Sequence, residues 1–374
     1  MTRAAALSFL LIALAGMRSN AQQSAEVHTA GFYESYSFDE GLGFDRLTEA
    51  TIPLGIGIPI GRWGSVALSS AWVNVELEAA GDGSSETIRG LIDTDVRLSV
   101  NVLPGRLVLL AGGIVPTGIQ TVDAGELGIL GAIASDVIGL ATNELGTGGS
   151  AGLGFAGAVP VGQFALGISS TVNTSFAYQP VSDTSARLRP GDELRVRAGL
   201  EGPLARRSYL RLAGVATVSA KDQVDGSPVN TAGNRLTGYL SFNQGIAATT
   251  LIVYAFDVYR TDPHIESTAL GTAALPPGNL FGAGLRWDVL LGRMWTLTPT
   301  AEFRNSQLAP FDEPDGPLEL AGRSLRAGID LATRISRSLR VVVQAEGLTG
   351  FIVEQGNRVD MTGFRVALHG EFRP

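Results

Sequence analysis

The sequence predicts an all-β fold, a transmembrane antiparallel up-and-down β-barrel of about sixteen strands with one helical loop insertion. Three observations lead to this prediction. Short turns and long polar loops follow one another along the chain. In the segments between them apolar and polar residues alternate, and the amino terminus resembles an export signal. The composition agrees, because 48 Gly and 17 Pro among 374 residues suit strands and turns better than helices.

The spacing of the turns sets the expected strands. Short turns are centred near residues 62, 104, 161, 205, 246, 292 and 337, and a longer polar or Gly/Pro-rich loop lies between each pair. An even strand number returns both termini to the same side of a membrane, and a count of fourteen remains open. The expected strands are 27–38, 45–60, 64–78, 87–103, 106–115, 149–160, 163–177, 192–203, 208–221, 235–246, 249–260, 280–291, 294–306, 321–335, 339–353 and 359–372.

Alternation within the segments indicates two different faces. In 325–335 one face is apolar, while the other carries Arg326, Asp330 and Arg334. A period of two places such sets on opposite sides of a strand. Strand 64–78 departs from the pattern, because its apolar set changes phase near Val73, and a β-bulge is expected there. A soluble exported β-sandwich or propeller would also alternate, so it stays as an alternative.

Aromatic residues at the predicted strand ends favour the membrane interpretation over the soluble one. Two interfacial girdles are typical of membrane barrels. Beside the short turns lie Trp63, Phe164, Tyr209, Trp295 and Phe372, and towards the long loops lie Phe176, Tyr178, Tyr259, Phe303 and Phe351.

The first 21 residues have the features of a cleavable signal peptide, which leaves 22–374 as the barrel. Arg3 supplies the positive charge, residues 4–15 form an apolar stretch, and Ser19-Asn20-Ala21 offers small residues for cleavage. The apolar stretch is shorter than the roughly 20 residues that a membrane-spanning helix needs, so export is favoured over anchoring.

Composition argues against several classes of function. The chain has no Cys, one Lys against 27 Arg, and a formal charge of −8, so it lacks thiolate chemistry and the basic runs typical of nucleic-acid binding. It has three His residues, which makes a multi-histidine metal site improbable. No nucleotide-binding motif follows a predicted strand. We expect no enzyme activity, no metal and no cofactor.

The final strand carries a resemblance to a known class of proteins. Phe364, Val366, Leu368 and Phe372 share one face, and Phe372 lies close to the carboxyl terminus. An exported chain closing on such a strand resembles the Gram-negative outer-membrane β-barrels, although Arg373-Pro374 follow the aromatic residue. The resemblance implies an outer-membrane location, contact with lipid and lipopolysaccharide, and insertion by the barrel assembly machinery. Homo-oligomers are common in that class.

A weaker resemblance concerns the middle of the chain. Pro116-Thr117-Gly118 and Leu145-Gly146-Thr147-Gly148 precede the segment 152–159. They are similar to elements of the aromatic-compound and fatty-acid transporter-like barrels. This resemblance implies a hydrophobic or aromatic solute.

The polar face of the strands predicts the lining of a lumen. A barrel of about sixteen strands is wide enough for a water-filled channel, in which charged side chains remain solvated. Because positive and negative groups are mixed, only weak charge selectivity is expected. The alternative is that these groups pair across strands and fill the lumen. The expected pore-lining residues are Arg195, Arg197, Arg286, Asp288, Glu302, Arg304, Arg326, Asp330, Arg334 and Arg340.

Residues 116–147 form a long, partly helical loop in this prediction. Residues 123–144 have apolar groups at helical spacing, and Asp123 with Glu126 three residues later fits a capping box. In general porins, which the architecture resembles, the third loop folds inward and narrows the pore. We therefore expect this loop in the barrel mouth, where its apolar side chains would hold a hydrophobic solute. A helix that only caps the lumen or contacts a neighbouring protomer is the alternative. The expected constriction residues are Asp123, Glu126, Leu127, Leu130, Ile133 and Val137.

The predicted barrel is compatible with two functions. The first is a passive channel or transporter for small solutes, hydrophobic or aromatic ones among them. The second is a structural or surface-interaction barrel whose lumen is packed and does not conduct.

Overall fold

The computed structural model describes residues 25–81, 83–231, 233–261, 277–292, 294–310, 316–354 and 356–373. The expected signal peptide, 1–21, lies outside these residues. Within the described ranges, no helix combines the length and the apolar character needed to cross a membrane.

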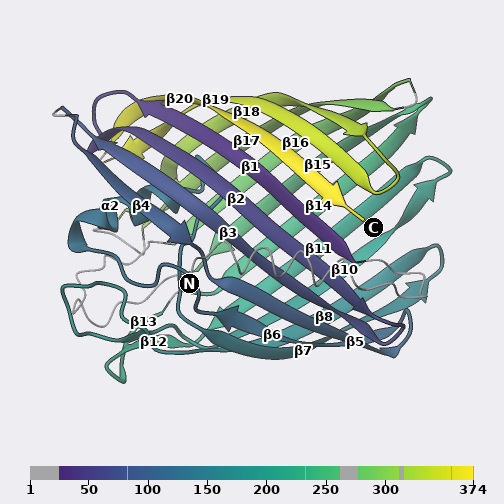
Figure 1. Cartoon of the computed structure of the whole chain (residues 1–374), viewed down its shortest axis with the longest axis horizontal. Coiled ribbons are helices and arrows are strands. Elements are labelled where there is room, and N and C mark those ends of the chain that lie inside the picture. The colour runs from purple at the N-terminus through teal and green to yellow at the C-terminus, as the bar shows by residue number, and fades with distance from the viewer. Residues whose placement is uncertain are drawn as a thin grey trace.

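The described strands form a closed antiparallel barrel of sixteen strands (Figure 1), which confirms the predicted fold class and excludes the sandwich and the propeller. Strand β1 pairs with β20 and so joins the two ends of the sheet. β4 and β5 both pair with β3 and make one interrupted strand. The barrel strands are β1 Glu26–Phe38, β2 Phe44–Ile60, β3 Gly64–Ala79, β4 Ser85–Leu91, β5 Thr94–Leu103, β6 Leu107–Val115, β7 Ser150–Val161, β8 Phe164–Ser175, β10 Glu193–Ala205, β11 Ser208–Ser219, β14 Arg235–Ile246, β15 Thr249–Arg260, β16 Gly278–Leu291, β17 Trp295–Leu308, β18 Glu319–Arg334, β19 Leu339–Glu354 and β20 Asn357–Phe372.

The two ends of the barrel differ, as the turn spacing predicts. One end carries the short turns and the carboxyl terminus (Figure 1). The other end carries the long connections, among them a short helix and a separate three-stranded sheet. These elements are the 3-10 helix η1 Ala124–Glu126, the helix α2 Leu127–Ile133, and the strands β9 Leu188–Arg189, β12 Lys221–Val224 and β13 Ser227–Thr231.

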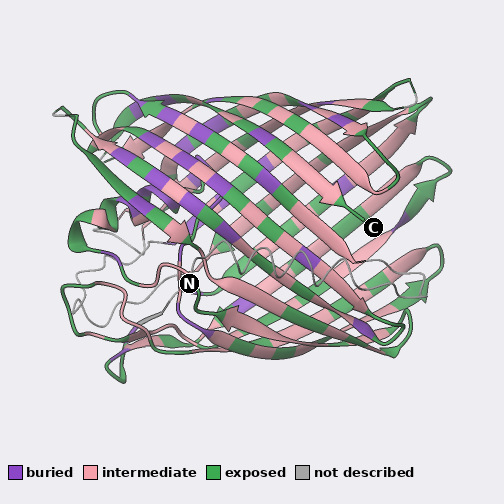
Figure 2. Cartoon of the chain, in the orientation of Figure 1, coloured by how far each residue is buried: buried purple, intermediate pink, exposed green. Residues whose placement is uncertain are grey.

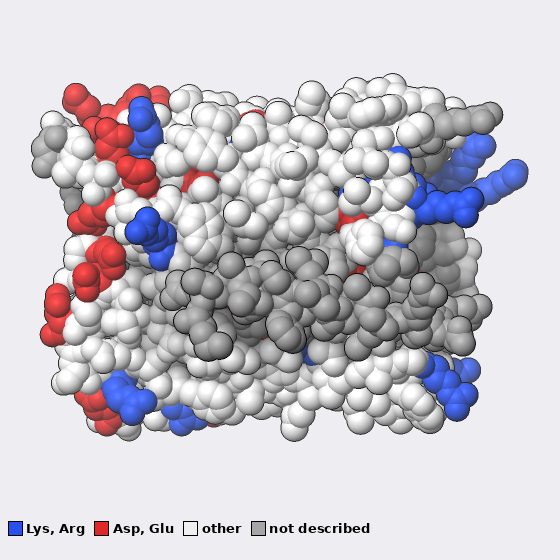
Figure 3. Space-filling view, in the orientation of Figure 1, with Lys and Arg blue, Asp and Glu red and all other residues white. Residues whose placement is uncertain are grey.

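The outer surface of the barrel is apolar across its middle. Residues paired directly across two strands point to the same side of a sheet, and the register therefore separates outward from inward positions. Figure 2 shows exposed positions alternating with less exposed ones along the strands, and the face drawn in Figure 3 has few charged side chains across its middle. Such a surface suits hydrocarbon and would be a liability in water. Its exposed members include Leu153, Ile168, Leu285, Leu325, Ile329, Val343, Val366 and Leu368.

Most of the predicted girdle residues lie on this outer surface. Trp63, Trp295 and Phe372 are exposed near the short turns. Phe176, Tyr259 and Phe303 are exposed towards the long loops. Two differ from the expectation. Tyr209 pairs with Asn243 on the lumen side, and Tyr178 lies in a loop, where its backbone bonds Leu188.

The β-bulge expected in 64–78 is wrong. The β2–β3 register runs without a shift from Arg46↔Glu78 to Ile60↔Gly64. The irregularity lies on the neighbouring strand, between β4 and β5, where the three residues 92–94 lie opposite two residues of β3, Ser70 and Ala71. The phase change near Val73 has another cause. Val73, Val75 and Leu77 point inward and are apolar because the inserted loop packs against them.

Candidate functional site

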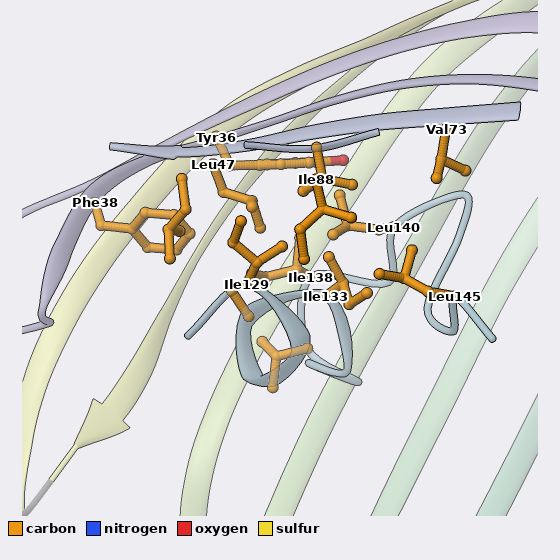
Figure 4. Packing of buried hydrophobic residues seen from close by; sticks show 14 of the residues in the cluster. Tyr36, Phe38, Leu47, Val73, Ile88, Ile129, Ile133, Ile138, Leu140 and Leu145 are labelled. Atoms are coloured by element: carbon orange, nitrogen blue, oxygen red, sulfur yellow. The ribbon is translucent and has the colours of Figure 1, made fainter. Parts of the chain in front are cut away.

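The insertion between β6 and β7 packs against the inside of the barrel wall. Its side chains Ile129, Ile133, Ile138 and Leu140 join a buried apolar cluster with inward-facing residues of the wall (Figure 4). The wall contributes Tyr36, Leu47, Val73, Val75, Ile88 and Met361, which come from β1, β2, β3, β4 and β20.

The helix of the insertion is shorter than the expected 123–144. Only Leu127–Ile133 is α-helical, after one turn of 3-10 helix, and the capping box is present, with the Asp123 amide donating to Glu126 Oε2 at 2.8 Å. Of the expected constriction residues, Leu127 is 45% exposed, whereas Ile133 is buried together with Ile129 against the wall. After residue 133 the backbone carbonyls bond wall side chains, which replaces the helical hydrogen bonds.

Four wall side chains hold the carbonyls of 136–139. Arg304 Nη1 donates to the Asp136 carbonyl at 2.9 Å, and Ser324 Oγ donates to that of Val137 at 2.7 Å. The next two donors bond the following carbonyls: Arg326 Nη2 to Ile138 at 2.7 Å and Arg365 Nη2 to Gly139 at 2.8 Å. Bonds from charged donors are stronger than neutral ones, so this row fixes the segment along β17, β18 and β20.

Carboxylates hold the amides that follow. Glu34 Oε1 accepts from the Ala141 amide at 2.8 Å, and Glu49 Oε1 accepts from the Thr142 amide at 2.9 Å. Asp93 accepts from the amides of Gly118 and Thr147, both at 2.9 Å, and so joins the two ends of the insertion. The loop therefore offers carbonyls to arginines on one stretch and amides to acids on the next.

The arginines that hold the loop are themselves paired with glutamates. Arg365 lies 2.8 Å from Glu34 and 3.6 Å from Glu346, and Arg326 lies 3.7 Å from Glu346. Glu34 has no exposed surface and also accepts the Tyr36 hydroxyl at 2.6 Å. Buried charges are tolerated when they are paired and hydrogen-bonded. This part of the inner surface, formed by β17 to β20 and β1 to β4, is called the covered wall below.

Gly139 of the loop lies against Arg304 of the covered wall. Its φ is +62°, and a Cβ at this position would lie 1.9 Å from Arg304 Nη1. A side chain would therefore suffer backbone strain and displace the guanidinium.

The opposite part of the inner surface, formed by β5 to β8, β10, β11 and β14, is called the open wall. Its inward-facing charged side chains remain accessible, as shown by Arg97, whose side chain is 76% exposed. Arg195, Arg197, Arg211 and Arg235 are also exposed. The insertion does not cover this wall.

A cavity of about 510 Å³ lies beside the 139–142 segment of the loop. The covered wall lines it with Phe32, Thr51, Arg304, Arg326 and Arg365. Asp93 and Asp95 contribute carboxylates from the other side. Ile92 and Leu140 are also in the lining, so the cavity next to the loop is mixed, with charged and apolar groups side by side.

The ten expected pore-lining residues all occupy inward positions, but in different surroundings. Arg195 and Arg197 lie on the open wall. Glu302, Arg304 and Arg326 belong to the network behind the loop. Arg286, Asp288 and Asp330 form one cluster, with Arg286 bonding both acids. Arg334 lies opposite Arg340 near the short turns.

Sequence reasoning missed Glu34 and Glu49, which hold the loop and are fully buried. The first strand is weakly patterned because apolar and acidic residues share its inner face. The available signal is the pair Glu34-x-Tyr36, which places a carboxylate and a phenol on one side of a strand.

The loops at the mouth are tied to one another. β12 pairs with both β9 and β13, and Val122 of the insertion forms a bridge with Val181. Asp222 Oδ1 accepts from the Gly191 amide at 2.7 Å. Burial raises the pKa of the Asp222 carboxyl, and this hydrogen bond opposes the rise.

We expect Ile133→Ala to loosen the loop. Ile133 is 1% exposed within the cluster, and truncation of a buried isoleucine costs about 2–5 kcal/mol through lost contacts and a cavity. Denaturant unfolding of the refolded protein and protease cleavage within 124–143 measure the effect. Leu127→Ala, on the same helix but exposed, is the matched control and should change stability by about 0.5 kcal/mol or less. Equal effects of the two substitutions would contradict the packing described here.

Comparison with known proteins supports the fold. No protein-family model matches the chain, and no curated protein matches its sequence. Among solved structures, a chain described as a bacterial polysaccharide outer membrane secretin has a TM-score of 0.51 at 11% identity, covering 95% of this chain and all of the other. Pseudomonas aeruginosa OccK2 (OpdF), solved with glucuronate, has a TM-score of 0.48 at 12% identity and covers 94% and 96%. The CymD monoaromatic hydrocarbon channel has 0.44 at 12% identity and covers 94% and 89%. With its closed sixteen-strand barrel and apolar outer band, the chain has the fold of the outer-membrane, porin-like β-barrels.

Proposed function

We propose that the chain is a passive outer-membrane channel for small solutes, exported by a cleavable signal at 1–21. The observation that carries the proposal is the open wall, where inward-facing charged side chains remain accessible although they lie inside a closed barrel. Charged groups that line water stay solvated and act on passing solutes. Neither catalysis nor a cofactor is part of this function.

The packed-lumen alternative predicts a different arrangement. A barrel filled by its own side chains would bury its inner charges in pairs all round, as the covered wall does. On the open wall, Arg97 and Arg211 do have acidic partners, Asp95 and Glu201, yet both arginines keep half or more of their side-chain surface. The insertion thus fills only one side of the lumen.

The geometry supports hydrophilic solutes better than the hydrophobic or aromatic solute expected from sequence. Of the side chains expected to hold an apolar solute, Ile133 and Val137 are buried against the wall. Leu127 is exposed and Leu130 is partly so, which leaves little apolar surface for a solute. The open wall carries exposed arginines, and the cavity beside the loop adds arginine, carboxylate and hydroxyl groups among its apolar residues.

The outer surface of the barrel and its last strand indicate what the protein would contact in the membrane. The apolar outer band would contact outer-membrane lipid and lipopolysaccharide, and β20, which ends at Phe372, would serve the barrel assembly machinery. A homo-oligomer is compatible with the exposed outer face, and cross-linking in detergent would measure it.

Reconstitution into a planar lipid bilayer tests the channel directly. The refolded protein should give discrete conductance steps, whereas bilayers given the same detergent without protein should stay silent. Swelling of proteoliposomes in isotonic sugar would show passage of uncharged hydrophilic solutes. A correctly folded protein that produces no conductance would support the packed-lumen alternative and contradict the channel.

A further inference from the structure

The arginines inside the barrel differ in whether an acidic side chain lies close enough to pair with them. On the covered wall, Arg304 and Arg365 have acidic partners within 4 Å, Glu302 and Glu34. Near the short turns Arg340 pairs with Glu371, whereas Arg334 beside it forms no ion pair in the described part of the chain. Arg286 has two, Asp288 and Asp330. These pairs cancel most of the charge in this part of the lumen, and the remaining arginines therefore decide the field.

The open wall keeps three arginines without an acidic partner. In the described part of the chain, Arg195, Arg197 and Arg235 form no ion pair and no side-chain hydrogen bond, and all three are exposed. Arg195 and Arg197 are two residues apart on β10 and share its inner face. Glu193, the next inward residue of β10, also forms no ion pair among the described residues.

The strand register brings the arginines into one row. Arg195 pairs with Thr217 of β11, Thr217 pairs with Arg235 of β14, and Arg235 pairs with Arg260 of β15. Arg235 and Arg260 are therefore direct neighbours across two strands, an arrangement that is unfavourable for like charges. Arg260 reaches the Asp136 carboxylate of the loop only at 3.9 Å.

We propose that this arginine row makes the channel selective for small anions whose carboxylate or phosphate oxygens contact Arg235, Arg195 and Arg197. The proposal rests on the channel function. Guanidinium groups bind such oxygens through two parallel hydrogen bonds, and an uncompensated positive wall raises the local concentration of anions. The mixed composition of the inner face predicts weak selectivity, but pairing on the covered wall leaves a net positive open wall.

Reversal potentials in a KCl gradient test this inference. The wild-type channel should prefer chloride, and the R195Q/R197Q/R235Q variant should lose the preference or favour potassium. The matched control is R89Q/R323Q/R358Q, which removes three positive charges from outward-facing positions and should keep the wild-type preference. Conducting wild-type channels without chloride preference would overturn the anion row and leave the channel function intact. An unchanged reversal potential in R195Q/R197Q/R235Q would also overturn it.

Solute competition identifies the anion. Succinate and inorganic phosphate, each added at constant ionic strength, should reduce the chloride current through the wild type and act less on R195Q/R197Q/R235Q. Sucrose at the same osmolarity controls for viscosity and volume exclusion. Block by one of the two anions alone would assign the row to carboxylates or to phosphates. Equal block of wild type and variant by both would contradict contact with these arginines.

Discussion

Replacing residues 124–143 by a short Gly-Ser linker is expected to raise the single-channel conductance roughly two- to threefold, because the loop occupies one side of the lumen. The barrel should still assemble, since β6 and β7 pair directly with each other from Leu107↔Gly157 to Ile114↔Ser150. Planar-bilayer recording measures the conductance, and the heat-dependent shift of the folded band on a gel reports the barrel.

The same variant separates two roles of the loop. If the apolar side chains held a hydrophobic solute, as the sequence suggests, uptake of an aromatic solute by proteoliposomes would fall while ion conductance rose. The structure predicts that uptake does not fall, because Ile129, Ile133 and Ile138 face the wall. Leu127→Ala serves as the control with an intact loop. An unchanged conductance in the linker variant would show that the loop does not narrow the lumen.

Arg365→Leu is expected to destabilise the barrel by about 3–5 kcal/mol, because it leaves buried Glu34 without its cation. Glu34 has no exposed surface and lies 2.8 Å from Arg365. The substitution also removes the donor to the Gly139 carbonyl and should loosen the loop. Denaturant unfolding of the refolded protein in detergent measures the stability, and protease cleavage within 124–143 measures the loop.

Two further variants make this prediction specific. Arg195→Leu removes an exposed, unpaired arginine from the open wall and should change the stability by about 0.5 kcal/mol or less. The double variant E34L/R365L removes both charges and should recover part of the loss, because a buried ion pair can often be replaced by apolar groups. If R365L and R195L had equal effects, the distinction between the covered and the open wall would be wrong.

The sequence by itself determined the strands. The observed bounds of β14 and β15, 235–246 and 249–260, match the predicted ranges, and most other strand ends agree within two residues. Alternation and turn residues are local signals, because a period of two follows from the strand backbone and Gly or Pro marks its interruption. The capping box at Asp123 is also local, and it is present.

Only the tertiary structure decided where the inner face is apolar and which charges are paired. Val73, Val75 and Leu77 suggest a phase error when strand 64–78 is taken alone, yet they are in phase and covered by the loop. The helix expected over 123–144 ends at Ile133, because arginines from distant strands bond the carbonyls that would have continued it. Arg326 and Ile138 are 188 residues apart in the chain and meet only when β1 closes on β20. Which charges pair depends on the closure of the barrel and on the path of the loop. Neither can be deduced from the alternation of residues within one strand.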